Sequence, residues 1–176
     1  MQKPPTSPLP RRHWLATLAA AGSALIGAAH AAAPAPASGR PKASPAVAAA
    51  AAAAEGVPHK MVYQLNQADE AYQEAIFNSI SALLKKYVDD VAIAVVVWGP
   101  GIHLLAKNPK RPVPGLHQQR VRSMAEAYGV RFIACGNTMH TVGWTQADMF
   151  DFAEIEEVGA AAVMELQEQG YAYLAW

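Results

Sequence analysis

The alternation of apolar runs of strand length with segments of helical periodicity predicts an α/β fold. Residues 91–98 are apolar throughout and rich in β-branched side chains, which is typical of a strand covered on both faces. Residues 69–87 repeat apolar side chains at steps of three and four, which indicates an amphipathic helix. Strands that alternate with helices predict a three-layer α/β/α sandwich with a mostly parallel sheet of about five strands.

The same two patterns, apolar runs of strand length and helical periodicity, predict the remaining elements. We expect strands at residues 61–65, 91–98, 130–134 and 171–175, with a short edge strand at 153–158. We expect helices at residues 69–87, 118–128 and 160–169, with a short one beginning near Thr145. Gly129 and Gly170 close two of these helices, and Thr145 with Asp148 resembles a capping box. The strand order does not follow from the sequence.

The first 31 residues have the organisation of a secretory signal peptide. Arg11 and Arg12 precede an uncharged apolar run, residues 14–29, which is shorter than the ~20 residues that a membrane-spanning helix needs. Ala29-His30-Ala31 is a cleavage signature of small residues. The paired arginines favour the twin-arginine route. We therefore expect export to the periplasm with cleavage near Ala31, and contact with a membrane only through this signal; an uncleaved anchor is the alternative.

Residues 32–58 are dominated by Ala and Pro, and we expect a disordered linker there. Four prolines interrupt residues 32–56, and the alanine run at residues 48–54 offers no distinct apolar stripe to bury. The folded domain is therefore expected at residues 59–176.

Charge and cysteine content exclude several classes of function. Residues 1–56 hold five Lys/Arg and one acid, whereas residues 57–176 hold nine Lys/Arg and thirteen acids. The folded part is therefore mildly acidic, which argues against a nucleic-acid partner. A single cysteine, Cys135, excludes an intramolecular disulfide and a multi-cysteine zinc site.

The candidate site follows from a rule for open α/β sheets, in which ligands bind outside the carboxyl ends of the strands. Cys135 follows the third predicted strand, where the amides at the start of a helix would stabilise a thiolate. Candidate binding residues from the three loops at this edge are Asn66, Gly99, Gly101, His103, Gly136, Asn137 and Thr138. Each has a structural alternative: the cysteine as a small buried hydrophobe, and the others as capping or turn residues. Lys107, Lys110 and Arg111 would attract an anion or form a solvated face.

Metals and cofactors are not expected. Cys135, Met139 and His140 are soft ligands close in sequence that would suit copper, but the second histidine of a blue-copper site is missing. The predicted site therefore contains no metal ligands.

Three stretches together resemble the exported branch of the DsrE/DsrF-like family. They are residues 63–67 (YQLNQ), 99–105 (GPGIHLL) and 134–139 (ACGNTM). The resemblance implies a compact α/β/α domain that assembles as a homotrimer or homohexamer. In sulfur-relay members, a cysteine at a comparable strand end accepts sulfane sulfur as a persulfide, and by position Cys135 would be that acceptor.

Two functions remain open at this stage. In the first, Cys135 takes sulfane sulfur from a donor and transfers it to an acceptor thiol of a protein or small molecule, which would make the protein a sulfurtransferase or sulfur carrier. Because the chain has no second cysteine, another molecule or subunit must take the sulfur. In the second, the domain is a non-catalytic oligomeric module that binds a small anion or a metal at the same edge.

Overall fold

The computed structural model describes residues 45–176, and the predictions for the leader and for residues 32–44 lie outside the described residues. Five strands form one sheet: β1 (His59–Leu65), β2 (Val91–Val97), β3 (Arg131–Cys135), β4 (Ala153–Glu156) and β5 (Ala172–Leu174). All pairings are parallel, in the order β4-β3-β2-β1-β5. The predicted α/β class and strand number are confirmed, and the short strand at residues 153–156 lies at an edge.

Within residues 45–176, five α-helices accompany the strands: α1 (Pro45–Ala53), α2 (Glu70–Tyr87), α3 (Gly115–Tyr128), α4 (Gly136–Val142) and α5 (Gly159–Glu168). Three short 3-10 helices lie in the connections: η1 (Val88–Asp90), η2 (Gly99–Leu105) and η3 (Gln146–Asp148). The start of α2 is fixed by Asp69, whose carboxylate accepts a hydrogen bond of 2.8 Å from the Tyr72 amide. The capping box expected at Thr145 forms, and it opens η3.

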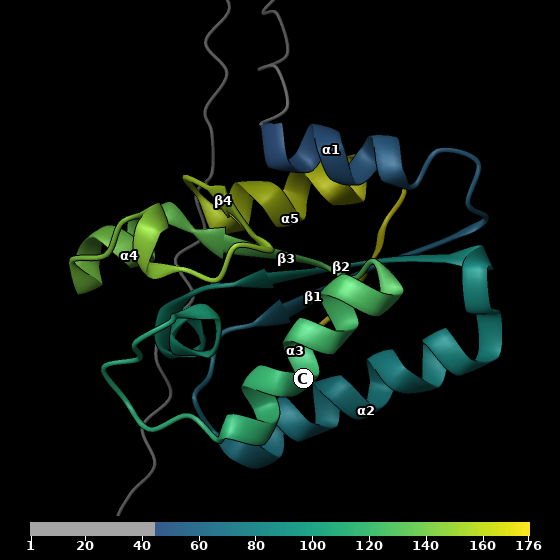
Figure 1. Ribbon diagram of the computed structural model, residues 1–176. Coiled ribbons are helices and arrows are strands. Elements are labelled where there is room, and N and C mark those ends of the chain that lie inside the picture. The colour runs from purple at the N-terminus through teal and green to yellow at the C-terminus, as the bar shows by residue number, and fades with distance from the viewer. Residues whose placement is uncertain (1–44) are drawn as a thin grey trace, which may run out of the picture. The chain divides into compact units, whose positions relative to one another are not determined.

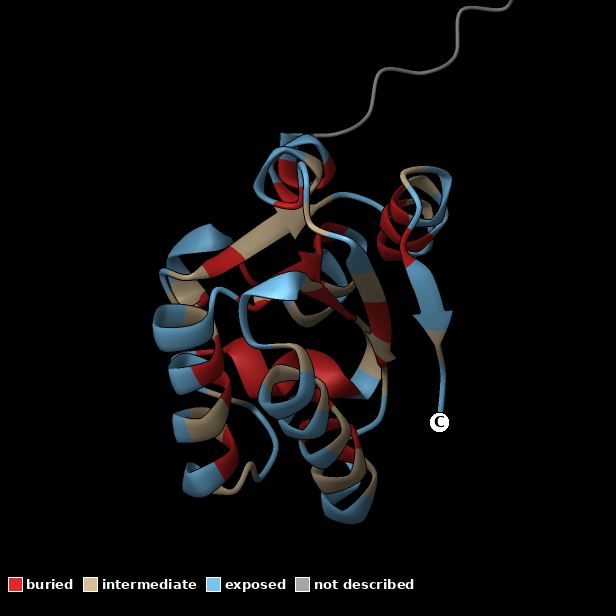
Figure 2. Ribbon diagram, turned by 90° about the vertical axis from the view of Figure 1, so that its right-hand side faces the viewer, coloured by how far each residue is buried: buried red, intermediate tan, exposed pale blue. Residues whose placement is uncertain are grey.

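The helices cover both faces of the sheet, with α1 and α5 on one side and α2 and α3 on the other (Figure 1). Alternate strand residues supply the two cores. Phe132 and Ala134 pack in the larger core with α2 and α3, whereas Ile133 packs in the smaller core with α1 and α5. Buried residues lie on the inner sides of these helices, and exposed residues lie on their outer sides (Figure 2).

The strand order explains which helix lies on which face. From β1 to β4 the sheet grows in one direction, so right-handed crossovers place α2, α3 and α4 on one face. The connection from β4 to β5 returns across the sheet, and α5 therefore lies on the opposite face. After β3 the chain turns to one face and after β4 to the other, so a topological switch point lies between the carboxyl ends of β3 and β4.

Helix α1 corrects the expectation of a linker that extends to residue 58. Ala46, Val47, Ala50 and Ala54 of this segment are buried against the smaller core. The hydroxyl group of Tyr171 donates a hydrogen bond of 3.0 Å to the Ala50 carbonyl. The alanine run is helical because no proline interrupts it, and its small side chains allow close packing. The folded part therefore begins before residue 59.

No helix among residues 45–176 combines the length and the hydrophobicity that a membrane span requires.

Candidate functional site

Cys135 is the last residue of β3 and the N-cap of α4. Since Ala134 belongs to the core under α2 and α3, the next side chain along the strand points to the opposite face, where α5 begins. Cys135 is 7% exposed. The thiol therefore lies at the switch point between β3 and β4, at the edge that the sequence predicted.

The sulfur atom of Cys135 is surrounded by backbone groups from two helix N-termini. The Gly159 amide, in the first turn of α5, donates to Sγ at 3.3 Å. The thiol lies 3.7 Å from the Glu157 carbonyl oxygen, which accepts its proton when the sulfur is protonated. Thr138 and Asn137, in the first turn of α4, also lower the pKa of the thiol. These donors favour a negative charge on the sulfur.

The electrostatic balance at Cys135 favours the thiolate. Burial alone raises the pKa of the thiol, because a charged sulfur loses hydration. Hydrogen bonds from the Thr138 side chain and from the amides of Thr138, Gly159 and Asn137 act in the opposite direction and outweigh burial. The pKa of Cys135 therefore lies below its ordinary value.

Two glycines make room for this arrangement. A Cβ atom at Gly136 would lie 3.2 Å from the Glu157 Cα atom, and the neighbouring Asn137 amide donates to the Glu157 carbonyl at 3.0 Å. A Cβ atom at Gly159 would lie 3.1 Å from the Cys135 Cβ atom. The absence of side chains thus lets the start of α5 approach the sulfur and lets the start of α4 pack on the loop after β4.

Thr138 connects the cysteine to the loop that follows β2. Its hydroxyl oxygen accepts a hydrogen bond of 3.3 Å from the Gly99 amide, which leaves the hydroxyl proton for the sulfur. Gly99 has φ +52°, and a Cβ atom there would lie 3.3 Å from the Asn66 carbonyl oxygen. A Cβ atom at Gly101 would lie only 2.7 Å from the Leu65 carbonyl oxygen. Close contacts therefore join the three predicted loops.

The side chain of Asn66 is engaged away from the sulfur. The Oδ1 atom of Asn66 accepts a hydrogen bond of 3.1 Å from the Tyr72 hydroxyl, and the backbone amide of Asn66 donates to the same hydroxyl at 3.3 Å. Tyr72 belongs to α2, so this pair fastens the end of β1 to the helix that follows. Asn66 does not cap α2, because the N-cap of that helix is Asp69.

His103 has a structural environment. It is 5% exposed, its Nδ1 atom accepts a hydrogen bond of 3.1 Å from the Lys110 amide, and its ring packs edge-on against Trp144 at 4.9 Å. Burial lowers the pKa of His103, and the positive charges of Arg111 and Lys110 lower it further. A neutral ring therefore fixes the loop between η2 and α3.

The soft ligands considered for copper diverge in space. Met139 packs in the core under α2 and α3, on the side of the sheet opposite to the one that Cys135 faces, and His140 is exposed. Within the described part of the chain, no three His, Cys, Asp or Glu side chains gather closely enough to hold a metal ion. The basic residues of the Pro-rich loop have local partners: Lys107 pairs with Asp151 at 2.9 Å, and Lys110 donates to the Val142 carbonyl.

Three residues at the site were missed by the sequence reasoning: Trp98, Glu157 and Gly159. A Cβ atom at Gly159 would lie 3.0 Å from the Trp98 ring, so this ring and the cysteine border the same small space. Val97 pairs with Ala134, which places Trp98 beside Cys135 across neighbouring strands. The tryptophan at the end of an apolar run was the available signal, because that strand ends at the same edge.

Fold and site together define a class of protein: a doubly wound, all-parallel α/β domain with a single thiol of lowered pKa at its switch point. The model of the DsrE/DsrF-like family matches residues 32–176, so the chain belongs to that family. A solved structure, a protein of unknown function, MTH1491 from Methanobacterium thermoautotrophicum, is 21% identical with a TM-score of 0.59. That match covers 67% of this chain and 99% of the other chain, and it supports the fold. A comparison with curated proteins found no match.

Proposed function

We propose that this protein is an exported sulfur carrier or sulfurtransferase in which Cys135 holds sulfane sulfur as a persulfide. One observation carries the proposal: the sulfur atom lies between the first turns of α4 and α5, and the hydrogen bonds there lower its pKa. Such an environment favours the nucleophilic form of a thiol. Membership of the DsrE/DsrF-like family supports the same chemistry.

The transfer has two displacement steps. The Cys135 thiolate attacks the outer sulfur of a donor persulfide, R–S–SH; a new S–S bond forms, the S–S bond of the donor breaks, and the donor thiolate leaves with the electron pair. An acceptor thiolate then attacks the outer sulfur of the Cys135 persulfide, and the Cys135 thiolate is the leaving group. Each step exchanges one S–S bond for another, so neither step needs an external oxidant or reductant. The same backbone amides that stabilise the thiolate stabilise this leaving group.

The test is the intact mass of the purified full chain after incubation with glutathione persulfide, polysulfide or thiosulfate. We expect the wild type to gain about 32 Da per sulfur atom, to lose it on addition of a thiol, and the variant Cys135→Ser to gain nothing. Absence of the gain, or transfer activity that survives in Cys135→Ser, would refute the proposal. An unreactive thiol in a protein that copurifies with a small anion or a metal would instead support the alternative of a binding module.

Export belongs to the same proposal and rests on the leader sequence. Arg11 and Arg12 before the apolar run support a twin-arginine signal with cleavage near Ala31, and the mature domain would act in the periplasm. Cell fractionation of the wild type and of the variant Arg11→Lys/Arg12→Lys tests this. We expect the wild type in the periplasmic fraction and the variant retained in the cytoplasm; equal distribution of both would contradict the route.

A further inference from the structure

Helices α2 and α3 cover the same face of the sheet, but polar contacts join them only near their N-terminal ends. The side chains of Gln73 and His117 are hydrogen-bonded at 2.9 Å. Arg120 donates to Glu74 at 2.7 Å and to Asn78 at 3.1 Å. Within the described part of the chain, no hydrogen bond or ion pair joins the two helices beyond these contacts. The later turns of the two helices are therefore free to enclose a space.

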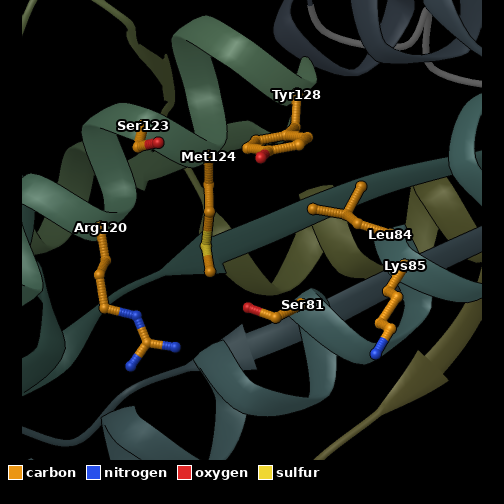
Figure 3. Close-up of a pocket in the computed structure, with 7 residues that line it drawn as sticks. All are labelled: Ser81, Leu84, Lys85, Arg120, Ser123, Met124 and Tyr128. Carbon is orange, nitrogen blue, oxygen red and sulfur yellow. The ribbon is translucent and has the colours of Figure 1, made fainter.

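A cavity of about 310 Å³ lies between these later turns (Figure 3). Helix α2 contributes Ser81, Leu84 and Lys85, and α3 contributes Arg120, Ser123, Met124 and Tyr128. The spacing of these positions places them on one face of each helix. Two of them are serines, whose small side chains leave space that larger residues would fill. The volume is at the small end of the range of ligand pockets, about 300–1,000 Å³.

The apolar walls of the cavity suit an aromatic ring. Met124 is only 6% exposed and lies between the facing residues of the two helices (Figure 3). Tyr128 lines the same space and is 62% exposed, so much of its surface is available to a ligand. Thioether and phenol groups both pack favourably against an aromatic ligand. Leu84 adds an aliphatic wall. The cavity therefore offers contacts for one flat apolar group.

The charges of the cavity favour a ligand with a single negative charge. No carboxylate lines the cavity. The charge of Arg120 is balanced by Glu74 at 2.7 Å, whereas Lys85 forms no ion pair with any described residue. The hydroxyl groups of Ser123 and Tyr128 have no hydrogen-bond partner in the described part of the chain, so they are free to donate. One uncompensated positive charge matches a carboxylate better than it matches a doubly charged phosphate.

We propose that this cavity binds a small aromatic monocarboxylate. Its ring packs between Met124 and Tyr128, and its carboxylate pairs with the Lys85 ammonium group. This binding site is separate from the sulfur chemistry, because α2 and α3 cover one face of the sheet and the Cys135 side chain lies on the other. Loss of the transfer activity in Cys135→Ser should therefore leave binding at the cavity unchanged.

Titration of the full chain with phenylacetate, followed by two-dimensional amide NMR spectra, tests the proposal. We expect saturable shifts confined to the amides around the cavity, with a dissociation constant in the millimolar range or below. Phenylacetamide has the same ring without the charge and should bind about threefold or more weakly, which is typical of one exposed ion pair. Absence of localised shifts, or equal affinity for the two compounds, would overturn the proposal.

Two pairs of variants locate the binding site. Lys85→Gln should weaken phenylacetate binding about threefold to fivefold, whereas Lys86→Gln, at the next exposed position of α2 and outside the cavity, should not. Ser123→Trp should fill the cavity and abolish binding, whereas Gln119→Trp, at an exposed position of α3 outside the cavity, should not. All four positions are exposed, so the melting temperatures should stay close to that of the wild type. Equal effects within either pair would overturn the proposal.

Discussion

Replacing Thr138 by valine removes one hydroxyl group from beside the Cys135 sulfur while it preserves the shape of the side chain. That hydroxyl is the largest of the groups that lower the pKa of the thiol. A hydrogen bond to a charged group contributes about 1.5–3 kcal/mol, and sulfur belongs at the lower end. About 1.4 kcal/mol is a factor of ten, so below the titration midpoint Thr138→Val should hold about tenfold less thiolate than the wild type.

The rate of alkylation of Cys135 by iodoacetamide, measured against pH, reports this change. We expect the midpoint of Thr138→Val at higher pH than that of the wild type, and a rate about tenfold lower in the acidic range. Thr138→Ser keeps the hydroxyl and should resemble the wild type. Thr141→Val removes a hydroxyl that bonds to the Asn137 carbonyl at 2.9 Å and should also have little effect. Identical pH profiles for Thr138→Val and wild type would refute this account of the thiolate.

The same shift links the thiol to stability. Because the pKa of Cys135 is lower in the folded chain than in the unfolded chain, ionisation stabilises the fold at pH values above the unfolded pKa. This contribution is lost as the pH falls through the folded pKa. The free energy of unfolding should therefore rise with pH across the interval between the two pKa values, and it should rise less in Thr138→Val.

Three other changes have outcomes that the structure fixes. Gly159→Ala should lower the free energy of unfolding by about 1–2 kcal/mol in denaturant titrations, because its Cβ atom would lie 3.0 Å from the Trp98 ring. The control Gly115→Ala meets nothing within 4 Å and should be neutral or slightly stabilising, so equal losses in both would contradict the packing argument. Gly101→Ala should cost about 3 kcal/mol, because its Cβ atom would lie 2.7 Å from a carbonyl oxygen of β1, and a stable variant would contradict the contact. Burial and two nearby cations lower the pKa of His103 in the folded chain. The neutral ring therefore stabilises the fold at pH values above the pKa of His103 in the unfolded chain. This contribution is lost as the pH falls below ~6.5. Thermal unfolding at several pH values should show that His103→Asn loses less stability at acidic pH than the wild type. Equal losses of stability in the two proteins would contradict this environment of His103.

Strands and helices were predictable where local chemistry determines them. The apolar run of β2 and the helical period of α2 each lie within one continuous segment, and both elements occur within a residue or two of the expected ends. Helix α1 was missed because its residues are nearly all alanine, so no stripe distinguishes its buried side. Its burial depends on contacts with α5 and Tyr171, which lie more than a hundred residues further along the chain.

The candidate site was predictable as an edge of the sheet, but its inner contacts were not. The rule that ligands bind at the carboxyl ends of the strands selects the loop at Cys135 without knowledge of the strand order. Its contacts with Glu157 and Gly159 require β4 to lie next to β3, and no local pattern specifies that neighbour. His103 was assigned to binding from its place near this edge, and its contact with the Lys110 amide is a further detail that the sequence does not specify.

The position of β1 in the sheet has a consequence for how the chain folds. β1 pairs with β2 on one side and with β5, the last strand, on the other. The bond from Tyr171 to Ala50 spans 121 positions in the sequence. Contacts between such distant segments form slowly, because a long loop must close first. Until β5 pairs with β1, the backbone N–H and C=O groups along that side of β1 have no partner in the sheet. A chain still being synthesised therefore remains open to aggregation and to chaperones until its final strand is available.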